Sequence, residues 1–297
     1  MKKTIDYYIR IQRVMQYIDE HLDEHITLKE LSKVACFSQY HFHRVFVACL
    51  GLTIQEYIYF KRLAKAASLL LNSTLPVTDI ALLVGYGTHA AFSKSFRKCY
   101  DMTPSEYRKM RGKGVNIHVP GIMNPVGSQK KLSRENRSEK ISHVVREIPE
   151  MKVMCITKKG FGGGFFEAAT DAFNEVNLYV IRNKLVDRIG HYLSIIPDLP
   201  YGYHDPDAKI HCGFSLKGDL LCDDHLDALT IEKGRYAVFT HHGPYEYIFQ
   251  TWNTAYFTCA FAGEERLRDT APFEIYLNSP IDTPAQKLIT EIHIPIM

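Results

Sequence analysis

Two short stretches, 50 residues apart, carry side chains suited to contacting nucleic acid. In the first, an arginine such as Arg44 can donate two hydrogen bonds to a guanine or grip a phosphate, and Tyr40 can lie against thymine methyl groups or the backbone. The second offers smaller side chains, which favours phosphate contacts over strict base readout. The predicted DNA-contacting residues are Gln39, Tyr40, His43 and Arg44, followed by His89, Ala90, Ser93, Lys94 and Arg97.

A repeat within the first hundred residues positions these side chains. When the sequence is shifted by 50 residues, apolar and capping positions coincide, which is typical of one supersecondary unit used twice. Each copy predicts a helix, a tight turn and a second helix, the form of a helix-turn-helix whose second helix enters the major groove. The matching pairs are Val34 and Val84, Ser38 and Thr88, Phe42 and Phe92, Phe46 and Phe96, and Thr53 and Thr103.

Local signals predict where these helices begin and end. Capping boxes at Thr27, Thr53 and Thr103, each with Glu three residues later, predict three helix starts. Ser38 and Thr88 are the predicted caps of the two DNA-reading helices. On the first of these helices, Phe42, Val45 and Phe46 form the core face and the predicted DNA-contacting residues face outward. The expected helices are 5–22, 28–35, 39–50, 54–71, 78–84, 89–100 and one from 104.

Charge is unevenly distributed along the chain, although the net charge of the 297 residues is only +3. Residues 1–112 carry 16 Lys and Arg against 10 Asp and Glu, residues 113–140 carry 6 against 2, and residues 141–297 carry 14 against 21. A basic front and an acidic back favour a front half that meets a polyanion. The predicted domains are 1–112, with two helix-turn-helix units, a linker at 113–143, and 144–297.

The back half shows the two-residue periodicity that is typical of β-strands. Its predicted strands fall into two similar groups, each with one helix. A shift of 83 residues places Ile148 on Ile231 and Ala172 on Ala255. The predicted fold is therefore multidomain: an all-α N-terminal domain and an α+β C-terminal domain of two β-α-β-β modules with two antiparallel half-sheets. The expected strands are 144–157, 189–196, 210–217, 228–240, 273–277 and 288–294, and the expected helices are 168–184 and 247–260.

The front half resembles the DNA-binding domain of the AraC/XylS family over residues 31–108. Cys36 stands where glycine is common in the turn, and Asp101 where glycine often precedes the last cap. The resemblance implies a monomeric domain with two recognition helices in successive major grooves, joined by the helix from Thr53 to Leu71. The matching features are Ala35, Ser38, Arg44-x-Phe46, Gly51, Ile80-Ala81, Gly85-Tyr86, Phe92, Phe96-Arg97, Pro104 and Tyr107-Arg108.

The back half resembles the GyrI-like effector-binding domain over residues 144–297. The complete chain is thereby similar to Rob-type regulators. The residues that carry the resemblance are His204-Asp205-Pro206, Gly234 to Phe239, Gly243-Pro244-Tyr245, Trp252, Pro272 to Leu277 and Thr290 to Pro295.

This second resemblance changes the expectation for one carboxylate. Period-2 alternation places Glu274 and Tyr276 on the same face of a strand. Without further information, a glutamate at such a position is expected to be exposed to solvent. The resemblance instead implies that Glu274 is the acidic residue of a ligand cavity. A partly buried carboxylate ringed by aromatic side chains suits a cationic or amphipathic small molecule. The candidate effector-binding residues are Glu274, Tyr276, Trp252, Tyr245, Tyr201 and Tyr203; Trp252 fits a plain helix–sheet core contact equally well.

Other constellations carry no chemistry that we can assign. The glycine-rich segment 160–164 lacks the Lys-Ser/Thr that a phosphate loop needs, and no histidine pair has a further metal ligand at suitable spacing. Seven cysteines without metal-ligand spacing are typical of reduced thiols. We expect no cofactor, no metal site and no catalytic residues. With no signal peptide or membrane span in the sequence, we expect a cytoplasmic protein, associated with the nucleoid when bound to DNA.

The leading hypothesis is a sequence-specific transcriptional regulator that is not an enzyme. Its predicted partners are double-stranded promoter DNA, a small-molecule effector and RNA polymerase, and no membrane. Two alternatives stay open: a GyrI-like hydrolase with Glu274 as general base, and a ligand-independent recruiter of the transcription machinery. Whether the regulator activates or represses stays open as well.

Overall fold

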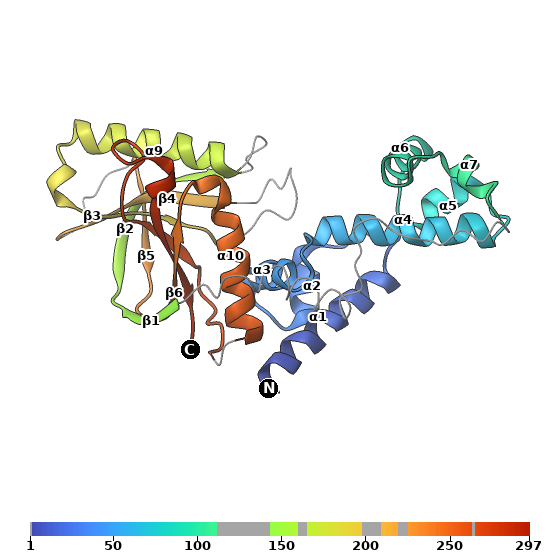
Figure 1. Ribbon diagram of the computed structural model, residues 1–297, viewed down its shortest axis with the longest axis horizontal. Coiled ribbons are helices and arrows are strands. Elements are labelled where there is room, and N and C mark those ends of the chain that lie inside the picture. Colours follow the sequence, from blue (N-terminus) through green and yellow to red (C-terminus); the bar gives the residue numbers. More distant parts are fainter. Residues whose placement is uncertain (1, 112–142, 160–164, 198–208, 219–224, 263–264) are drawn as a thin grey trace. The chain divides into compact units, whose positions relative to one another are not determined.

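The computed structural model describes residues 2–111, 143–159, 165–197, 209–218, 225–262 and 265–297 (Figure 1). Its contacts divide the chain into two compact units. The helical unit comprises Tyr8–Phe37 and Leu52–Arg134, and the sheet unit comprises Met1–Tyr7, Ser38–Gly51 and Glu135–Met297. The predicted linker, 113–143, lies outside the described residues except for its last position.

The front half is helical, as predicted. All three predicted capping boxes are present. The hydroxyls of Thr27, Thr53 and Thr103 each accept a hydrogen bond from the backbone N–H of the glutamate three residues later. That glutamate's side chain in turn accepts one from the backbone N–H of the threonine. Ser38 occupies a cap position, but its hydroxyl makes no capping hydrogen bond, in contrast to Thr88. The helices are α1 (Lys2–Glu20), α2 (Leu28–Ala35), α3 (Gln39–Leu50), α4 (Ile54–Asn72), α5 (Val77–Leu83), α6 (His89–Tyr100) and α7 (Pro104–Arg108).

The two departures from the common glycine pattern are accommodated in the backbone. Cys36 ends α2 with φ 51°, and Asp101 ends α6 with φ 60°. Both are in the left-handed region that glycine adopts freely, which explains why glycine is common there. Gly51 fills the equivalent position after α3, with φ 70°.

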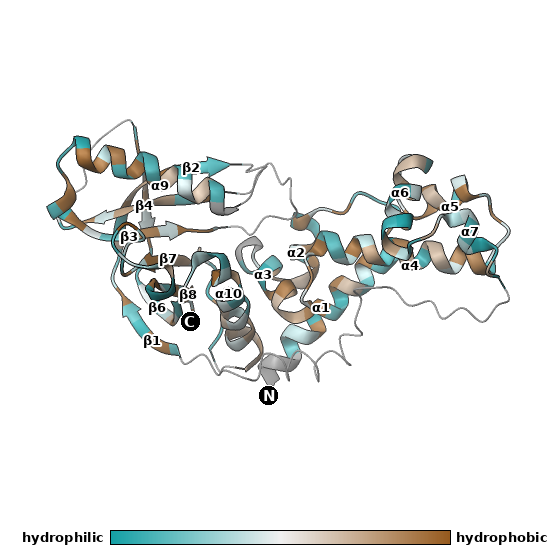
Figure 2. Ribbon diagram, turned by 45° about the horizontal axis from the view of Figure 1, so that its top comes forward, coloured by the Kyte–Doolittle hydropathy of each residue, from teal (hydrophilic) through white to brown (hydrophobic). Residues whose placement is uncertain are grey.

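The helical unit is held together by aromatic and aliphatic side chains from α4 to α7. Phe92 and Phe96 of α6 are fully buried, with ring centroids 5.5 Å apart, and Tyr107 of α7 packs edge-on against Phe96. Figure 2 shows hydrophilic and hydrophobic residues interspersed along α1. The buried cluster is Leu63, Ala66, Ala67, Leu70, Ile80, Ala81, Val84, Phe92, Phe96 and Tyr107.

The sheet unit contains one eight-stranded antiparallel sheet with the order β1-β6-β8-β7-β3-β4-β2-β5. The strands are β1 (His143–Ile148), β2 (Met151–Lys159), β3 (Ile189–Ile195), β4 (Lys209–Leu216), β5 (Asp227–Ile231), β6 (Gly234–His242), β7 (Phe273–Tyr276) and β8 (Ile289–Pro295). The unit also contains the helices α3, α9 (Phe165–Arg182) and α10 (Ile248–Phe257).

Each module has one strand more than the β-α-β-β prediction. The stretch 144–157 is two strands separated at Pro149, and the stretch 228–240 is two strands separated before Gly234, which has φ 146°. The first strand of each module pairs with the second strand of the other: β1 with β6, and β5 with β2. The predicted half-sheets are thus joined, through β7 and β3, into one sheet.

Cross-strand register shows which side chains share a face of this sheet. Tyr276 pairs with Tyr192, Tyr192 with Phe214, and Phe214 with Met154, so these four residues lie on one face. Met154 and Phe214 pack against Val176 and other residues of α9, so this is the face that α9 covers. The opposite face carries a second core of Val153, Cys155, Leu193, Ile195, Ile231, Tyr236, Val238, Phe273 and Ile275.

Candidate functional site

A buried carboxylate, Glu274, lies on β7 and is 4% exposed. One of its oxygens accepts a hydrogen bond from Trp252 Nε1 at 2.6 Å, and the other accepts one from the Tyr276 hydroxyl, also at 2.6 Å. The Tyr276 hydroxyl is 2.7 Å from Ser194 Oγ. Such donors replace the water that a buried carboxylate has lost. With Tyr245, these residues are called the carboxylate cluster below.

Strand geometry and one helix bring the cluster together. Glu274 and Tyr276 share a face of β7, as the alternation predicted, and Ser194 lies directly opposite Glu274 on the neighbouring strand β3. Trp252 reaches the same face from α10, so α9 and α10 cover the same side of the sheet. The hydrogen-bonded members of the site therefore lie on two strands and a helix.

Aromatic rings surround the carboxylate. The Tyr245 ring meets that of Tyr276 edge-on at 5.5 Å, and Phe173 of α9 meets Tyr276 edge-on at 5.3 Å. Trp252 stacks on Tyr256, one helical turn further along α10, with centroids 5.9 Å apart. The remaining predicted wall residues, Tyr201 and Tyr203, lie outside the described residues.

The electrostatics of the cluster favour a cation. Burial raises the pKa of the Glu274 carboxyl, while the hydrogen bonds from Tyr276 and Trp252 and the charge of Arg44 oppose that rise. Burial and the negative charge of Glu274 together raise the pKa of Tyr245 to about 12. A positive charge beside Glu274 offsets the cost of burying the ionised carboxylate, so a cation is the ligand that the cluster stabilises best.

A cation from the chain itself stacks on an aromatic ring of this cluster, and its charge acts on Glu274. Arg44 of α3 is 2% exposed, and its guanidinium carbon lies 4.7 Å from the centroid of the Trp252 ring and 5.4 Å from that of Tyr256. Its Nη2 donates a hydrogen bond of 2.6 Å to the carbonyl oxygen of Ile196, at the end of β3. Both α3 and α10 belong to the sheet unit, and they lie side by side in Figures 1 and 2.

His41 fastens α3 at a second point. Its Nδ1 is 3.2 Å from the Tyr256 hydroxyl, and its Nε2 contacts the carbonyl oxygen of Arg268. Burial lowers the pKa of His41 to about 4, and the nearby charge of Arg44 acts in the same direction. The imidazole is therefore neutral in this arrangement at neutral pH.

The prediction that the polar residues of α3 face outward does not hold for two of them in this structure. His43 and Arg44 are each 2% exposed, and every residue from His41 to Ala48 is buried. The pattern marked polar side chains as solvent-facing, whereas α10 covers that face of α3. The side chains of Gln39 and Tyr40 lie outside the described part of the chain.

The corresponding residues of α6 are accessible within their own unit. His89, Ala90, Lys94 and Arg97 are exposed, and Ser93 is half-buried with its hydroxyl 3.4 Å from His89 Nε2. Thr88 caps the helix by accepting from the Ala91 amide at 3.2 Å. The start of α6 and its exposed basic side chains are suited to phosphate contacts, and their role in binding DNA stays a prediction.

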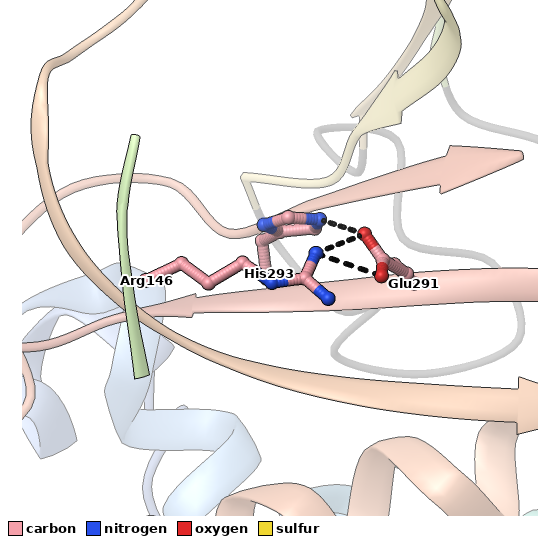
Figure 3. A network of polar contacts seen from close by, with 3 residues as sticks. All are labelled: Arg146, Glu291 and His293. Carbon is pink, nitrogen blue, oxygen red and sulfur yellow. Dashed lines mark hydrogen bonds and ion pairs between the residues drawn. The ribbon is translucent and has the colours of Figure 1, made fainter. Parts of the chain in front are cut away.

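A second buried carboxylate lies on the opposite face of the sheet (Figure 3). Arg146 Nη1 donates to both oxygens of Glu291, at 2.8 and 2.9 Å, and His293 Nε2 is 3.3 Å from the same carboxylate. His293 also stacks on Phe273 with centroids 4.5 Å apart, and burial lowers its pKa to about 4. Because Glu291 is already paired with Arg146, it is less suited than Glu274 to an added cation.

Several members of the site were not predicted from the sequence. Tyr256 follows Trp252 by four residues and therefore shares its helix face, a spacing that could have identified it. Ser194 and the carbonyl of Ile196 could not have been found without the pairing of β3 with β7. Nor does any local signal connect Arg44 with residues about 200 positions later.

Two classes of feature are missing from the described residues. No group of three or more His, Cys, Asp or Glu there is placed to hold a metal ion. No helix in the described ranges has the length and apolar character to cross a membrane. The glycine-rich segment 160–164 lies outside those ranges.

Comparison with known proteins assigns both halves. Residues 31–110 match the family described as a helix-turn-helix domain, and residues 142–297 match the GyrI-like small molecule binding domain. The Bacillus subtilis HTH-type transcriptional regulator YbfP is 38% identical over 103 residues, which cover 34% of this chain and 35% of YbfP. The regulatory protein SoxS of Salmonella typhimurium is 37% identical over 98 residues, covering 33% of this chain and 92% of SoxS.

The chain is also similar to proteins of known structure. The C-terminal domain of AraT, a response regulator from Geobacillus stearothermophilus, is 31% identical, with 37% of this chain and 93% of that chain covered and a TM-score of 0.33. The chain thus spans about a third of the length of YbfP and nearly all of SoxS.

Proposed function

The chain belongs to the GyrI-like small-molecule-binding family and carries an AraC-type helix-turn-helix domain, and on that premise we propose that it regulates transcription in response to a cationic small molecule. The observation that supports the effector class is the buried carboxylate Glu274, held between Trp252 and Tyr276 in an aromatic environment. Indole and phenol rings attract a cation through their negative faces, and the carboxylate supplies the opposite charge.

The DNA part of the proposal is supported by the repeated helix-turn-helix and by the basic, exposed face of α6. We propose Gln39, Tyr40, His43 and Arg44 as the base-reading set and the α6 residues as the anchoring set. The domain boundaries at 112 and 144 are part of this proposal, as are contact with RNA polymerase and a cytoplasmic location on the nucleoid.

DNA binding is tested with the full chain and a pool of random-sequence duplexes from which bound molecules are repeatedly selected. We expect one enriched sequence, bound with an affinity that falls steeply as salt rises. Lys94→Met should weaken binding to every sequence alike, whereas Arg44→Met should also relax the preference at one base pair. No enrichment, or binding that is independent of salt, would refute the proposal. Transcription from the enriched sequence with purified RNA polymerase then shows activation or repression.

Effector binding can be followed without a label, because Trp252 is the chain's one tryptophan. The cation tetraphenylphosphonium and its neutral relative triphenylphosphine oxide are titrated against tryptophan fluorescence. We expect the cation alone to change the emission. Glu274→Gln should weaken its binding by about tenfold or more, the scale of losing one charged partner.

Glu291→Gln is the matched control, since Glu291 is also a buried carboxylate but lies on the opposite face of the sheet. It should leave the affinity for the cation unchanged. If both variants weaken binding equally, the effect is a general loss of stability, and Glu274 is not the charge that selects the ligand.

A further inference from the structure

We propose that the carboxylate cluster is a guanidinium-type site that the chain fills with its own Arg44, and that an external planar cation competes with Arg44 and thereby releases α3. This inference rests on the proposed function, since it takes the cluster to be the effector site. It adds the shape of the ligand and a mechanism by which ligand binding changes the availability of a DNA-reading helix.

The contacts of Arg44 are those that a planar cation would make. Its guanidinium lies over Trp252 and Tyr256, whose stacked rings, 22° from parallel, form one aromatic wall. The Ile196 carbonyl receives one of its N–H groups, and Glu274 provides the negative charge nearby. Guanidinium is planar, delocalised and weakly hydrated, so it suits an aromatic wall better than a compact ammonium does.

The second copy of the repeat shows that burial at this position is not a property of the motif. Lys94 of α6 corresponds to Arg44 of α3 after the shift of 50 residues, and Lys94 is exposed. Arg44 is instead 2% exposed because α10 lies against its helix. Among the described residues, α6 packs mainly on α4, α5 and α7 of its own unit.

Reading a base and occupying the cluster exclude each other. An arginine side chain that lies on Trp252 cannot reach a guanine, and a helix whose residues 41–48 are all buried cannot enter a groove. The chain therefore has a closed arrangement, with α3 on α10, and a released one, with α3 free. A ligand that binds the cluster only after Arg44 has left shifts the population toward the released arrangement.

The test titrates the full chain with phenylguanidine, which is cationic at neutral pH, and with phenylurea, its neutral isostere, using Trp252 fluorescence. The decisive variant is Arg44→Met, which keeps an unbranched apolar stem but removes the guanidinium. Lys94→Met is its matched control. We expect phenylguanidine to bind Arg44→Met about tenfold more tightly than the wild type. This factor applies if the closed arrangement of the wild type outnumbers the released one by about ten to one, because the ligand binds only the released one. Lys94→Met should match the wild type, and phenylurea should bind none of them.

A second variant keeps the test decisive if Arg44→Met fails to fold. Tyr256→Phe removes the hydroxyl that contacts His41 while retaining the ring under Arg44, so it loosens α3 without altering the cation. We expect it to raise phenylguanidine affinity about threefold. In the wild type, saturating phenylguanidine should also strengthen binding to the enriched duplex, whereas phenylurea should not.

The outcomes separate this inference from the proposed function. If phenylguanidine binds the wild type, Arg44→Met and Tyr256→Phe with equal affinity, and Glu274→Gln abolishes binding, the cluster is a cation site but Arg44 does not compete for it. If neither phenylguanidine nor tetraphenylphosphonium binds any variant, both the proposed effector class and this inference are wrong. If Arg44→Met binds phenylguanidine more tightly but saturating phenylguanidine leaves the affinity of the wild type for the enriched duplex unchanged, the release of α3 is refuted.

Discussion

Acidification from pH 7.5 to pH 5.5 should loosen α3 from α10, because His41 is buried there in its neutral form. The groups around this imidazole are the Tyr256 hydroxyl, the Arg268 carbonyl and the charges of Arg44 and Asp269. Burial dominates and lowers the pKa of His41 from its ordinary value of 6.5 to about 4. A proton therefore binds more readily once α3 has left α10 and the imidazole has reached water.

The direction and size of the pH effect follow from the difference between the buried and the ordinary pKa of His41. The contribution of neutral His41 to the closed arrangement is fully present above pH 6.5 and is lost progressively as the pH falls toward 4. The full loss is about 3 kcal/mol at about 1.4 kcal/mol per pH unit. At pH 5.5, one unit below the ordinary value, about 1.4 kcal/mol is lost, which corresponds to about a tenfold shift toward the released arrangement.

The assay is acrylamide quenching of Trp252, whose side chain is shielded in the closed arrangement and becomes accessible when α3 leaves. The residue is 5% exposed in the structure. Quenching should rise between pH 7.5 and 5.5 in the wild type. It should stay flat in His41→Gln, which retains hydrogen-bonding groups but does not titrate. The other histidines of the sheet unit, such as His293, are the same in both proteins, so their contributions cancel in the comparison. Equal pH dependence in both proteins would refute the assignment of the effect to His41.

Three further predictions concern stability. Phe92→Ala should lower the free energy of unfolding of the helical unit by about 3–5 kcal/mol, because the ring is fully buried. Chemical denaturation followed by circular dichroism measures this free energy. A loss below about 1 kcal/mol would contradict the packing of Phe92. Thr53→Ala should cost about 1 kcal/mol in the same assay through loss of the cap, and Thr53→Ser should restore most of it. Gly213→Ala should destabilise the sheet unit by about 3 kcal/mol, since its Cβ would lie 2.0 Å from the carbonyl oxygen of Met154. Gly87→Ala, with no atom within 4 Å, should leave the stability of the helical unit unchanged. Circular dichroism follows the unfolding of both units, and an equal effect of the two variants would contradict the register of β2 and β4.

The helices were predictable from the sequence because their signals are local. A threonine and a glutamate three residues apart fix a helix start such as that at Thr53, and the 50-residue repeat aligns α3 with α6 without a shift. The alternation of β7 likewise placed Glu274 and Tyr276 on one face. These features depend on residues within one or two turns of each other.

The features that the sequence did not predict depend on contacts between distant residues. The exchange of β1 and β5 between modules pairs His143 with Phe239, and no local pattern records that pairing. Amphipathic periodicity treats a polar side chain as solvent-facing, so it assigned Arg44 to the outside of α3. Only the position of α10 shows that the same side chain is buried against Trp252.

The strand exchange also bears on how such a domain could have originated. Read from either edge, the strand order of the sheet is the same when corresponding strands of the two modules are matched, with β1 equivalent to β5 and β6 equivalent to β2. One module by itself would lack the partner strand that the other supplies. A single-copy ancestor would therefore have completed its sheet as a symmetric homodimer by swapping strands between subunits. Once the two halves are joined in one chain they are free to differ: α10 carries Trp252 and contacts Arg44 of α3, whereas its counterpart α9 packs on Met154 and Phe214.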